Sequence, residues 1–198
     1  MPGIKREPRL GIDTKCGVDY AEKPRPVGAS AGLGNRSHSR CYRRQMGLFS
    51  RSNKRTKVRK GSLEEYMRDA AADLVEAFRG YGSPVRDGEL DYSAGSLHTI
   101  DRVLGDFYDR EVALPDDLHF MASAYIFEVA RNQFGGHYVR GEEEGSYALV
   151  IGEPEFSVGV MVMDKVAARV TNGPEDNIPF FYEGIAPLIE RKVSATLI

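Results

Sequence analysis

The chain has 198 residues, and its charged side chains are divided very unevenly along that length. Residues 1–60 hold 16 of the 27 Lys and Arg side chains with four acids, whereas residues 61–198 hold 25 acids and a net charge of −14. Both cysteines, Cys16 and Cys41, precede residue 61, which excludes a disulfide framework for the acidic part. No apolar run approaches the ~20 residues of a membrane-spanning helix, and no apolar stretch typical of a secretory signal follows the N-terminus. These features predict a cytoplasmic protein.

Residues 1–60 are predicted to be a disordered basic tail, because they lack the apolar periodicity that could offset the entropy of ordering them. At Met46 the sequence changes to Met-Gly-Leu-Phe-Ser-Arg, which is typical of the start of a bacterial cytosolic protein. We therefore expect Met46 to be the true start and residues 1–45 to be upstream sequence. Residues 61–198 are long enough to form a single globular domain.

A basic run lies at the end of this tail, between residues 51 and 60. Its simplest interpretation is a solvated linker, and a weak contact with an anionic membrane surface or with nucleic acid is the alternative. No aromatic side chains are interleaved with the charges, so specific nucleic-acid recognition is not predicted. The basic side chains are Arg51, Lys54, Arg55, Lys57, Arg59 and Lys60.

Three helices are predicted at the start of the domain. Ser62 and Glu65 form a capping-box pattern before a helix that ends near Arg79, where Gly80 and Gly82 follow. A second helix is predicted from Ser93 to about Asp109. The third begins at a cap formed by Asp116 or Asp117 and ends at a pair of glycines, and it is apolar almost all round. A helix without a polar face is expected at the centre of its core.

Beyond the glycine pair the apolar period changes to two, which predicts strands. Residues 137–140 and 146–151 read as a β-hairpin around a turn at 141–145, and residues 156–160 as a third strand. Helical spacing returns at residues 163–170, and the segment 176–192 is predicted to form one or two short helices because of its prolines. The expected fold is α+β: helices first, then a small antiparallel sheet of about three strands, then C-terminal helices.

The third helix carries the most informative charged pair, Glu128 and Arg131, which lie three residues apart on one face. One interpretation is a structural ion pair within the core, since a lone buried charge is costly. The other is a carboxylate with a raised pKa that acts as a general base near His137. His98 and His119 would even allow a metal site, but no metal-binding motif is present. We predict no metal and no cofactor.

Other catalytic signatures are missing from residues 61–198, which contain no cysteine nucleophile, phosphate-binding glycine loop or Gly-x-Ser-x-Gly motif. The three acids of the hairpin turn, Glu142–Glu144, read as a solvated tip. Gly135 and Gly136 have a structural explanation, because one can cap the helix in a left-handed conformation and the other allows close passage of a strand.

Two stretches resemble a family of small bacterial domains of unknown function. The first is Asp91-Tyr92-Ser93-x-x-Ser96-Leu97, and the second is Tyr125-Ile126-Phe127-Glu128-x-x-Arg131-x-x-x-Gly135-Gly136-x-Tyr138. The family has Asp-Tyr-Ser-x-x-Ser-Leu and Gly-Glu-x-x-Arg-x-x-Gly-Gly-x-Trp, so Phe127 replaces Gly, Tyr138 replaces Trp and one residue is inserted before the glycines. A later stretch, Arg169-Val170-x-Asn172-Gly173-x-Glu175-Asp176, looks like the family's Arg-Leu-x-Asn-Gly-x-x-Asp.

The resemblance spans about residues 88–190 and implies a bacterial cytosolic α+β protein, with some relatives that are immunity-like. It implies no established active site. From the residues we predict binding positions at Glu128, Arg131, Gly135, Gly136 and Tyr138.

Our leading functional hypothesis is a non-enzymatic, immunity-like protein that binds a basic protein partner, because an acidic field accelerates such an encounter. The alternatives are a small enzyme that uses Glu128 and His137 as an acid–base pair, and attachment of the basic tail to a membrane or nucleic acid.

Overall fold

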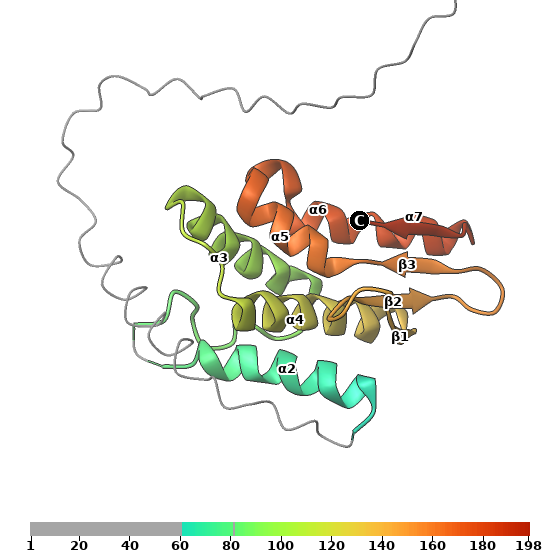
Figure 1. Ribbon diagram of the computed structural model, residues 1–198, viewed down its shortest axis with the longest axis horizontal. Coiled ribbons are helices and arrows are strands. Elements are labelled where there is room, and N and C mark those ends of the chain that lie inside the picture. Colours follow the sequence, from blue (N-terminus) through green and yellow to red (C-terminus); the bar gives the residue numbers. More distant parts are fainter. Residues whose placement is uncertain (1–60, 81) are drawn as a thin grey trace, which may run out of the picture. The chain divides into compact units, whose positions relative to one another are not determined.

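The computed structural model describes residues 61–80 and 82–198 (Figure 1). The expectations for residues 1–60, including the start at Met46 and the basic run, lie outside the described residues. The described part of the chain has the expected α+β architecture, with helices, then a small sheet, then further helices.

Helix α2, Leu63–Ala77, begins at the predicted capping box. The Ser62 hydroxyl accepts the Glu65 N–H at 3.2 Å, and the Glu65 carboxylate accepts the Ser62 N–H at 3.1 Å. Each residue thereby satisfies a backbone donor that the first turn of a helix leaves without an intrahelical partner.

The next two helices agree with the sequence pattern except at their starts. A 3₁₀ turn, Ala94–Ser96, precedes α3, Leu97–Asp109, and α4 spans Asp116–Phe134. The prediction that Asp116 or Asp117 caps α4 was wrong, because both lie inside its first turn and the residue at the cap position is Pro115. Their carboxylates instead face the positive end of the helix dipole, which also stabilises the helix start.

The sheet has four strands in the order β1-β2-β3-β4: His137–Arg140, Tyr147–Ile151, Val158–Val160 and Ala195–Leu197. The first three strands are antiparallel, with Tyr138 opposite Leu149 and Leu149 opposite Val160. The fourth strand was not predicted, and it pairs with β3 in parallel, so the sheet is mixed rather than purely antiparallel. Strands β1 and β4 form its two edges.

The helices after β3 are α5, Val162–Asn172, then a 3₁₀ turn at Pro174–Asp176, α6, Ile178–Glu183, and α7, Ile185–Glu190. The predicted C-terminal helix is thus two short helices separated by Gly184. Pro179 is tolerated in the first turn of α6, where its missing N–H has no helical partner to lose.

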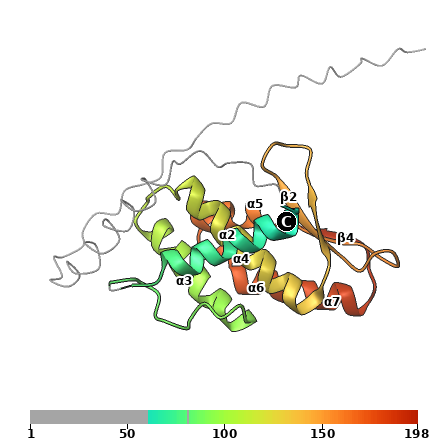
Figure 2. The ribbon, with the colours of Figure 1, turned by 90° about the horizontal axis from the view of Figure 1, so that it is seen from below.

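Helix α4 occupies the centre of the described core, between α2 on one side and α5 on the other (Figure 1). Tyr125 and Phe127, near the middle of α4, are fully buried. Helix α3 packs against α5 and α6, and the sheet lies to one side of the helices, in contact with α2, α4 and α7 (Figure 2). This arrangement confirms that the almost wholly apolar helix is central.

Removal of residues 1–60 is expected to leave the folding of the domain intact. The reasons are that α2 starts with its own capping box at Ser62 and that the described core is built from Met67 onward. Thermal melts of the full chain and of residues 61–198, recorded side by side, should agree within a few degrees. A much lower melting temperature for the shorter chain would show that the N-terminal segment is needed for folding.

Candidate functional site

Glu128, Arg131 and Tyr138 form one connected group between α4 and β1. Arg131 donates two hydrogen bonds of 2.9 Å to the Glu128 carboxylate, and the Tyr138 hydroxyl donates to Glu128 Oε1 at 2.7 Å. The Glu128 side chain is only 4% exposed, whereas that of Arg131 is 25% exposed. Burial, reinforced by the hydrogen bond to Glu128, raises the pKa of the Tyr138 phenol, so this group remains a neutral donor.

His137 does not join this group. Its Nε2 lies 3.6 Å from Glu153 Oε2, and both side chains are about half exposed. Because neighbouring side chains of a strand point to opposite faces, burial of Tyr138 under α4 directs His137 away from it. The hydrogen bonds of the Glu128 carboxylate in the described residues run to Arg131 and Tyr138. An acid–base role for Glu128 and His137 therefore stays a prediction without a contact that favours it.

Gly135 and Gly136 connect α4 to β1, and both have positive φ angles, of 75° and 103°. Gly135 N–H closes the helix by donating to the Arg131 carbonyl oxygen at 2.8 Å. A Cβ atom at Gly136 would lie 2.5 Å from the backbone oxygen of Val150 in β2. The pair thus allows the chain to turn directly from the helix into the sheet, which places Tyr138 over Glu128.

The stretch from Asp91 to Ser96 is held by a second polar network, built on Tyr125 of α4. The Tyr125 hydroxyl accepts the Tyr92 N–H at 2.9 Å and lies 2.7 Å from the Ser96 hydroxyl oxygen. Since the Ser96 hydroxyl donates to the Ser93 carbonyl oxygen at 2.6 Å, its oxygen is the acceptor for Tyr125. Asp91 and Ser93 add the local bonds that form the turn before α3.

The two stretches that carry the family resemblance therefore meet in space. Tyr92, which has a φ of 62°, stacks on Tyr125 with ring centroids 4.8 Å apart. Burial raises the pKa of the Tyr92 phenol, and Tyr125 and Glu128 add to the shift. The residues of the Tyr125 network and of the Glu128 group bond mainly to one another. We therefore interpret both as structural contacts that hold α3, α4 and β1 together.

A further buried ion pair joins α3 to α5. Arg169 donates to the two carboxylate oxygens of Asp101 at 2.8 and 3.2 Å, and Asp101 Oδ1 also accepts the Ile178 N–H at 3.0 Å. Arg169 Nη1 is buried without a hydrogen-bond partner in the described part of the chain. A Cβ atom at Gly105 would lie 2.7 Å from Arg169 Nη2, which explains the glycine inside α3.

The stretch from Arg169 to Asp176, which also resembles the family, ends in contacts that hold a turn of the fold. Asp176 accepts hydrogen bonds from Lys165 at 2.6 Å and from Asn172 at 2.7 Å, and these two bonds lower the pKa of its carboxyl. Gly173 has a φ of 88° and lies under the ring of Tyr108, where a Cβ atom would meet ring carbon at 2.5 Å. The turn between α5 and α6 thus depends on this glycine.

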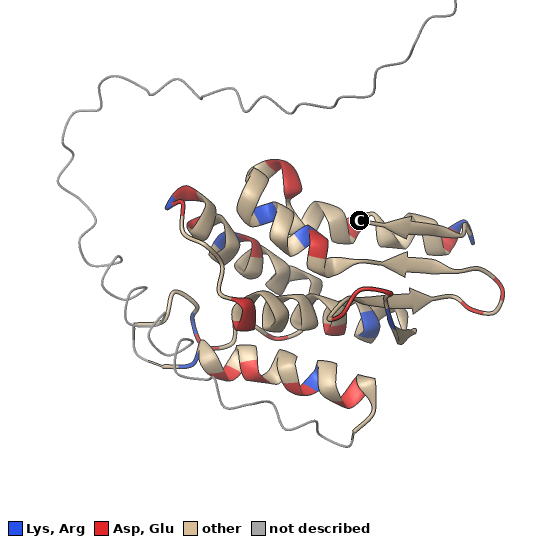
Figure 3. Cartoon of the chain, in the orientation of Figure 1, with Lys and Arg blue, Asp and Glu red and all other residues tan. Residues whose placement is uncertain are grey.

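A groove of about 470 Å³ opens beside the turn of the β1–β2 hairpin, and we call it the hairpin groove. The Glu142–Glu144 turn, which is red in Figure 3, and Asp164 of α5 supply its acids. Its apolar and aromatic walls come from Tyr147, Met161 and Met163, and His119 bonds to the Met163 backbone oxygen at 2.9 Å. The remaining lining residues are Gly141, Gly145 and Ser146.

Three partly exposed aromatic rings, Tyr66, Phe120 and Tyr147, continue this surface toward the start of α2. Their centroids are 5.1 Å apart for Tyr66 and Phe120, 5.9 Å for Phe120 and Tyr147, and 6.4 Å for Tyr66 and Tyr147. We call them the aromatic trio. Rings of this kind, partly exposed and next to polar groups, are enriched in protein–protein interfaces.

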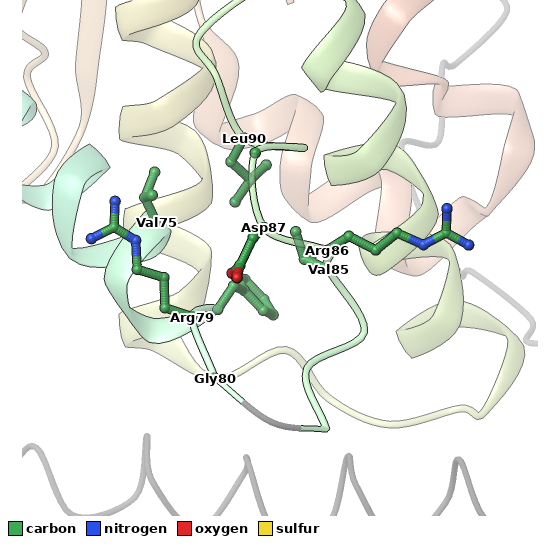
Figure 4. A pocket seen from close by; sticks show the side chains of 9 residues that line it. Val75, Arg79, Gly80, Val85, Arg86, Asp87 and Leu90 are labelled. Atoms are coloured by element: carbon green, nitrogen blue, oxygen red, sulfur yellow. The ribbon is translucent and has the colours of Figure 1, made fainter.

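A second depression, of about 450 Å³, lies between the end of α2 and the segment 85–90. Val75, Val85 and Leu90 form its apolar floor, and Arg79 and Arg86 extend away from it in different directions (Figure 4). The two guanidinium groups therefore do not converge on a common ligand position. Its lining holds one acid, Asp87, and one aromatic ring, Phe78, whereas four acids line the hairpin groove.

Within residues 61–80 and 82–198, no cluster of three or more metal-binding side chains occurs. None of the helices in that part of the chain is long and apolar enough to cross a membrane. Comparisons with protein-family models, with curated proteins and with solved structures found no match.

The predicted binding residues Glu128, Arg131, Gly135, Gly136 and Tyr138 do come together, but mainly through contacts with one another. From the sequence, Glu142–Glu144 reads as a solvated tip and as one part of the acidic field of the domain, and nothing there places Tyr147, Met161 or Met163 beside it. The two-residue spacing of Tyr147 and Leu149 in β2 indicates that the strand has two faces, but it does not indicate which elements cover each face.

Proposed function

We propose that this domain is a non-enzymatic protein-binding module whose partner is basic, and that the hairpin groove receives it. The observation that carries the proposal is that four acids and the side chains of Tyr147, Met161 and Met163 line one depression. An apolar surface supplies contact area, while the acids select cationic side chains and repel acidic ones. Neither feature alone would define a partner.

The charge of the whole domain supports the same proposal. Residues 61–198 carry a net charge of −14, and positions of acidic residues, red in Figure 3, recur along α2 and at the hairpin turn. A field of this sign steers a cationic protein toward the domain and accelerates the encounter. An immunity-like role, in which the domain blocks a basic toxin such as a nuclease, is the most specific form of the proposal.

Capture of the partner from cells of the native host tests this proposal. We expect the full chain, cross-linked before lysis, to capture a protein with excess Lys and Arg whose cross-links map to residues 141–147. Glu142→Gln, Glu143→Gln and Glu144→Gln, combined in one hairpin variant, should lose that protein. These side chains are exposed, so the variant is expected to fold normally.

A matched control variant carries Asp73→Asn, Glu183→Gln and Glu190→Gln. It removes the same number of exposed charges away from the hairpin groove. The control should capture the partner as well as the parent chain does. Equal capture by the hairpin variant and the parent, or an acidic partner, would refute the proposal.

A further inference from the structure

The chain contains a second feature that matches the hairpin groove in charge, namely its own basic run between residues 51 and 60. Six of these ten residues are Lys or Arg and none is acidic. The groove presents four carboxylates, from Glu142, Glu143, Glu144 and Asp164. The two are therefore complementary in charge.

The described chain begins directly after the basic run, about one helical turn before Tyr66 of the aromatic trio. Gly61 follows it directly, and Ser62 caps α2. Tyr66 lies four residues beyond the cap, or about 6 Å along the helix axis at 1.5 Å per residue. Its ring is 6.4 Å from that of Tyr147, which lines the groove.

The fully extended run is longer than the rise along α2 to Tyr66 and the distance from Tyr66 to Tyr147 combined. Residues 51–60 can extend to roughly 30 Å at about 3.3 Å per residue. A tether of this length holds its charges near the groove at an effective concentration in the millimolar range. Even an affinity too weak to matter between separate molecules is then enough to populate the contact.

We propose that the basic run 51–60 binds in the hairpin groove of its own chain and competes there with the basic partner. This inference rests on the proposed function in one respect, that the groove accepts a basic segment. The Lys and Arg head groups contact the carboxylates of the hairpin turn, and their aliphatic stems cover Tyr147, Met161 and Met163. A partner must displace the run, so the apparent affinity for the partner is reduced by the fraction of chains in which the run is bound.

Paramagnetic broadening in the full chain tests this contact without a partner. Cys16→Ser and Cys41→Ser remove the native thiols, and Asn53→Cys carries a spin label within the run. At low salt the amide signals of Gly141, Gly145 and Ser146 are expected to lose most of their intensity. Near 1 M salt, where the Debye length falls to about 3 Å, they should recover.

The hairpin variant and the control variant of the preceding section separate charge recognition from mere proximity of the label. Broadening of the groove amides should be largely lost in the hairpin variant and unchanged in the control. Equal broadening in both would overturn the proposal, because it would reflect only the tether. Broadening centred on another acidic turn, such as that at 116–117, would also overturn it.

Contact between two copies of the chain is distinguished from contact within one copy by a mixing experiment. Spin-labelled chain without isotope is mixed with isotope-labelled chain without a spin label. Broadening in that mixture would contradict binding within one chain. The inference and the proposed function fail in different experiments. Loss of partner capture in the hairpin variant without intramolecular broadening supports the function alone. Intramolecular broadening with capture independent of the hairpin supports binding of the run in the groove, but it contradicts both the proposed function and competition with the partner.

Discussion

Replacement of Asp101 with alanine is expected to destabilise the domain by about 3–5 kcal/mol, the usual cost of leaving one member of a buried ion pair without its partner. The side chains of Arg169 and Asp101 are only 8% and 14% exposed. Arg169 Nη1 has no hydrogen-bond partner among the described residues, and Nε and Nη2 donate there to Asp101, so loss of Asp101 would leave the guanidinium without an acceptor in that part of the chain. The Ile178 N–H at the start of α6 would lose its acceptor as well.

Chemical denaturation of matched variants can measure this effect. The double change Asp101→Asn with Arg169→Met should cost less than Asp101→Ala, because the asparagine oxygen can still accept from Ile178 and no buried charge remains. Arg79→Met is the control, since Arg79 and its partner Glu76 are 66% and 73% exposed and such pairs contribute about 0–1 kcal/mol. A cost for Asp101→Ala as small as that of the control would contradict the assignment of a buried pair.

Replacement of Arg131 with methionine is expected to destabilise the domain by about 3 kcal/mol, because the buried Glu128 carboxylate would keep only the Tyr138 hydroxyl as a donor. Replacement of both charged residues, as Glu128→Leu with Arg131→Met, should cost less than the single Arg131 change. Tyr138→Phe removes one hydrogen bond to a charged acceptor and should cost about 1–3 kcal/mol.

Urea denaturation of these three variants, with unchanged m values, would separate the structural interpretation from a catalytic one. If Arg131→Met and Tyr138→Phe left the free energy of unfolding unchanged, the group would not stabilise the fold. The residues would then have to be explained by a binding or catalytic role.

The elements that the sequence predicted well are those whose determinants are local. The Ser62 and Glu65 capping box, the glycines after α4 and the period-two pattern of β2 each specify structure within a few residues. The central position of α4 was also predictable, because a helix without a polar face has no side suited to contact with water.

The elements that were missed depend on residues distant in sequence. Strand β4 has only three residues and becomes a strand because α6 and α7 return it to the edge of β3. The Asp101–Arg169 pair spans 68 positions, and no spacing rule connects its members. The acid–base interpretation placed His137 near Glu128, yet the alternation of β1 directs the His137 side chain away from it.

The candidate site divides in the same way. The charged pair of α4 and the glycines could be found from spacing, and their contacts with Tyr138 follow from the short turn between α4 and β1. The hairpin groove could not be found, because its walls come from α4, the hairpin and α5. Only the packing of these elements places Met163 beside the Glu142–Glu144 turn.

The rate at which the captured partner associates with the domain, timed by stopped flow from low to high ionic strength, tests the role of the hairpin groove most directly. At low salt we expect a rate well above the ~10⁵–10⁶ M⁻¹s⁻¹ of unsteered association, falling steeply as salt rises. The hairpin variant should associate more slowly and depend less on salt, whereas the control variant should behave like the parent chain. A rate that is indifferent to salt, or equal in the parent chain and the hairpin variant, would contradict recognition of a basic partner in this groove.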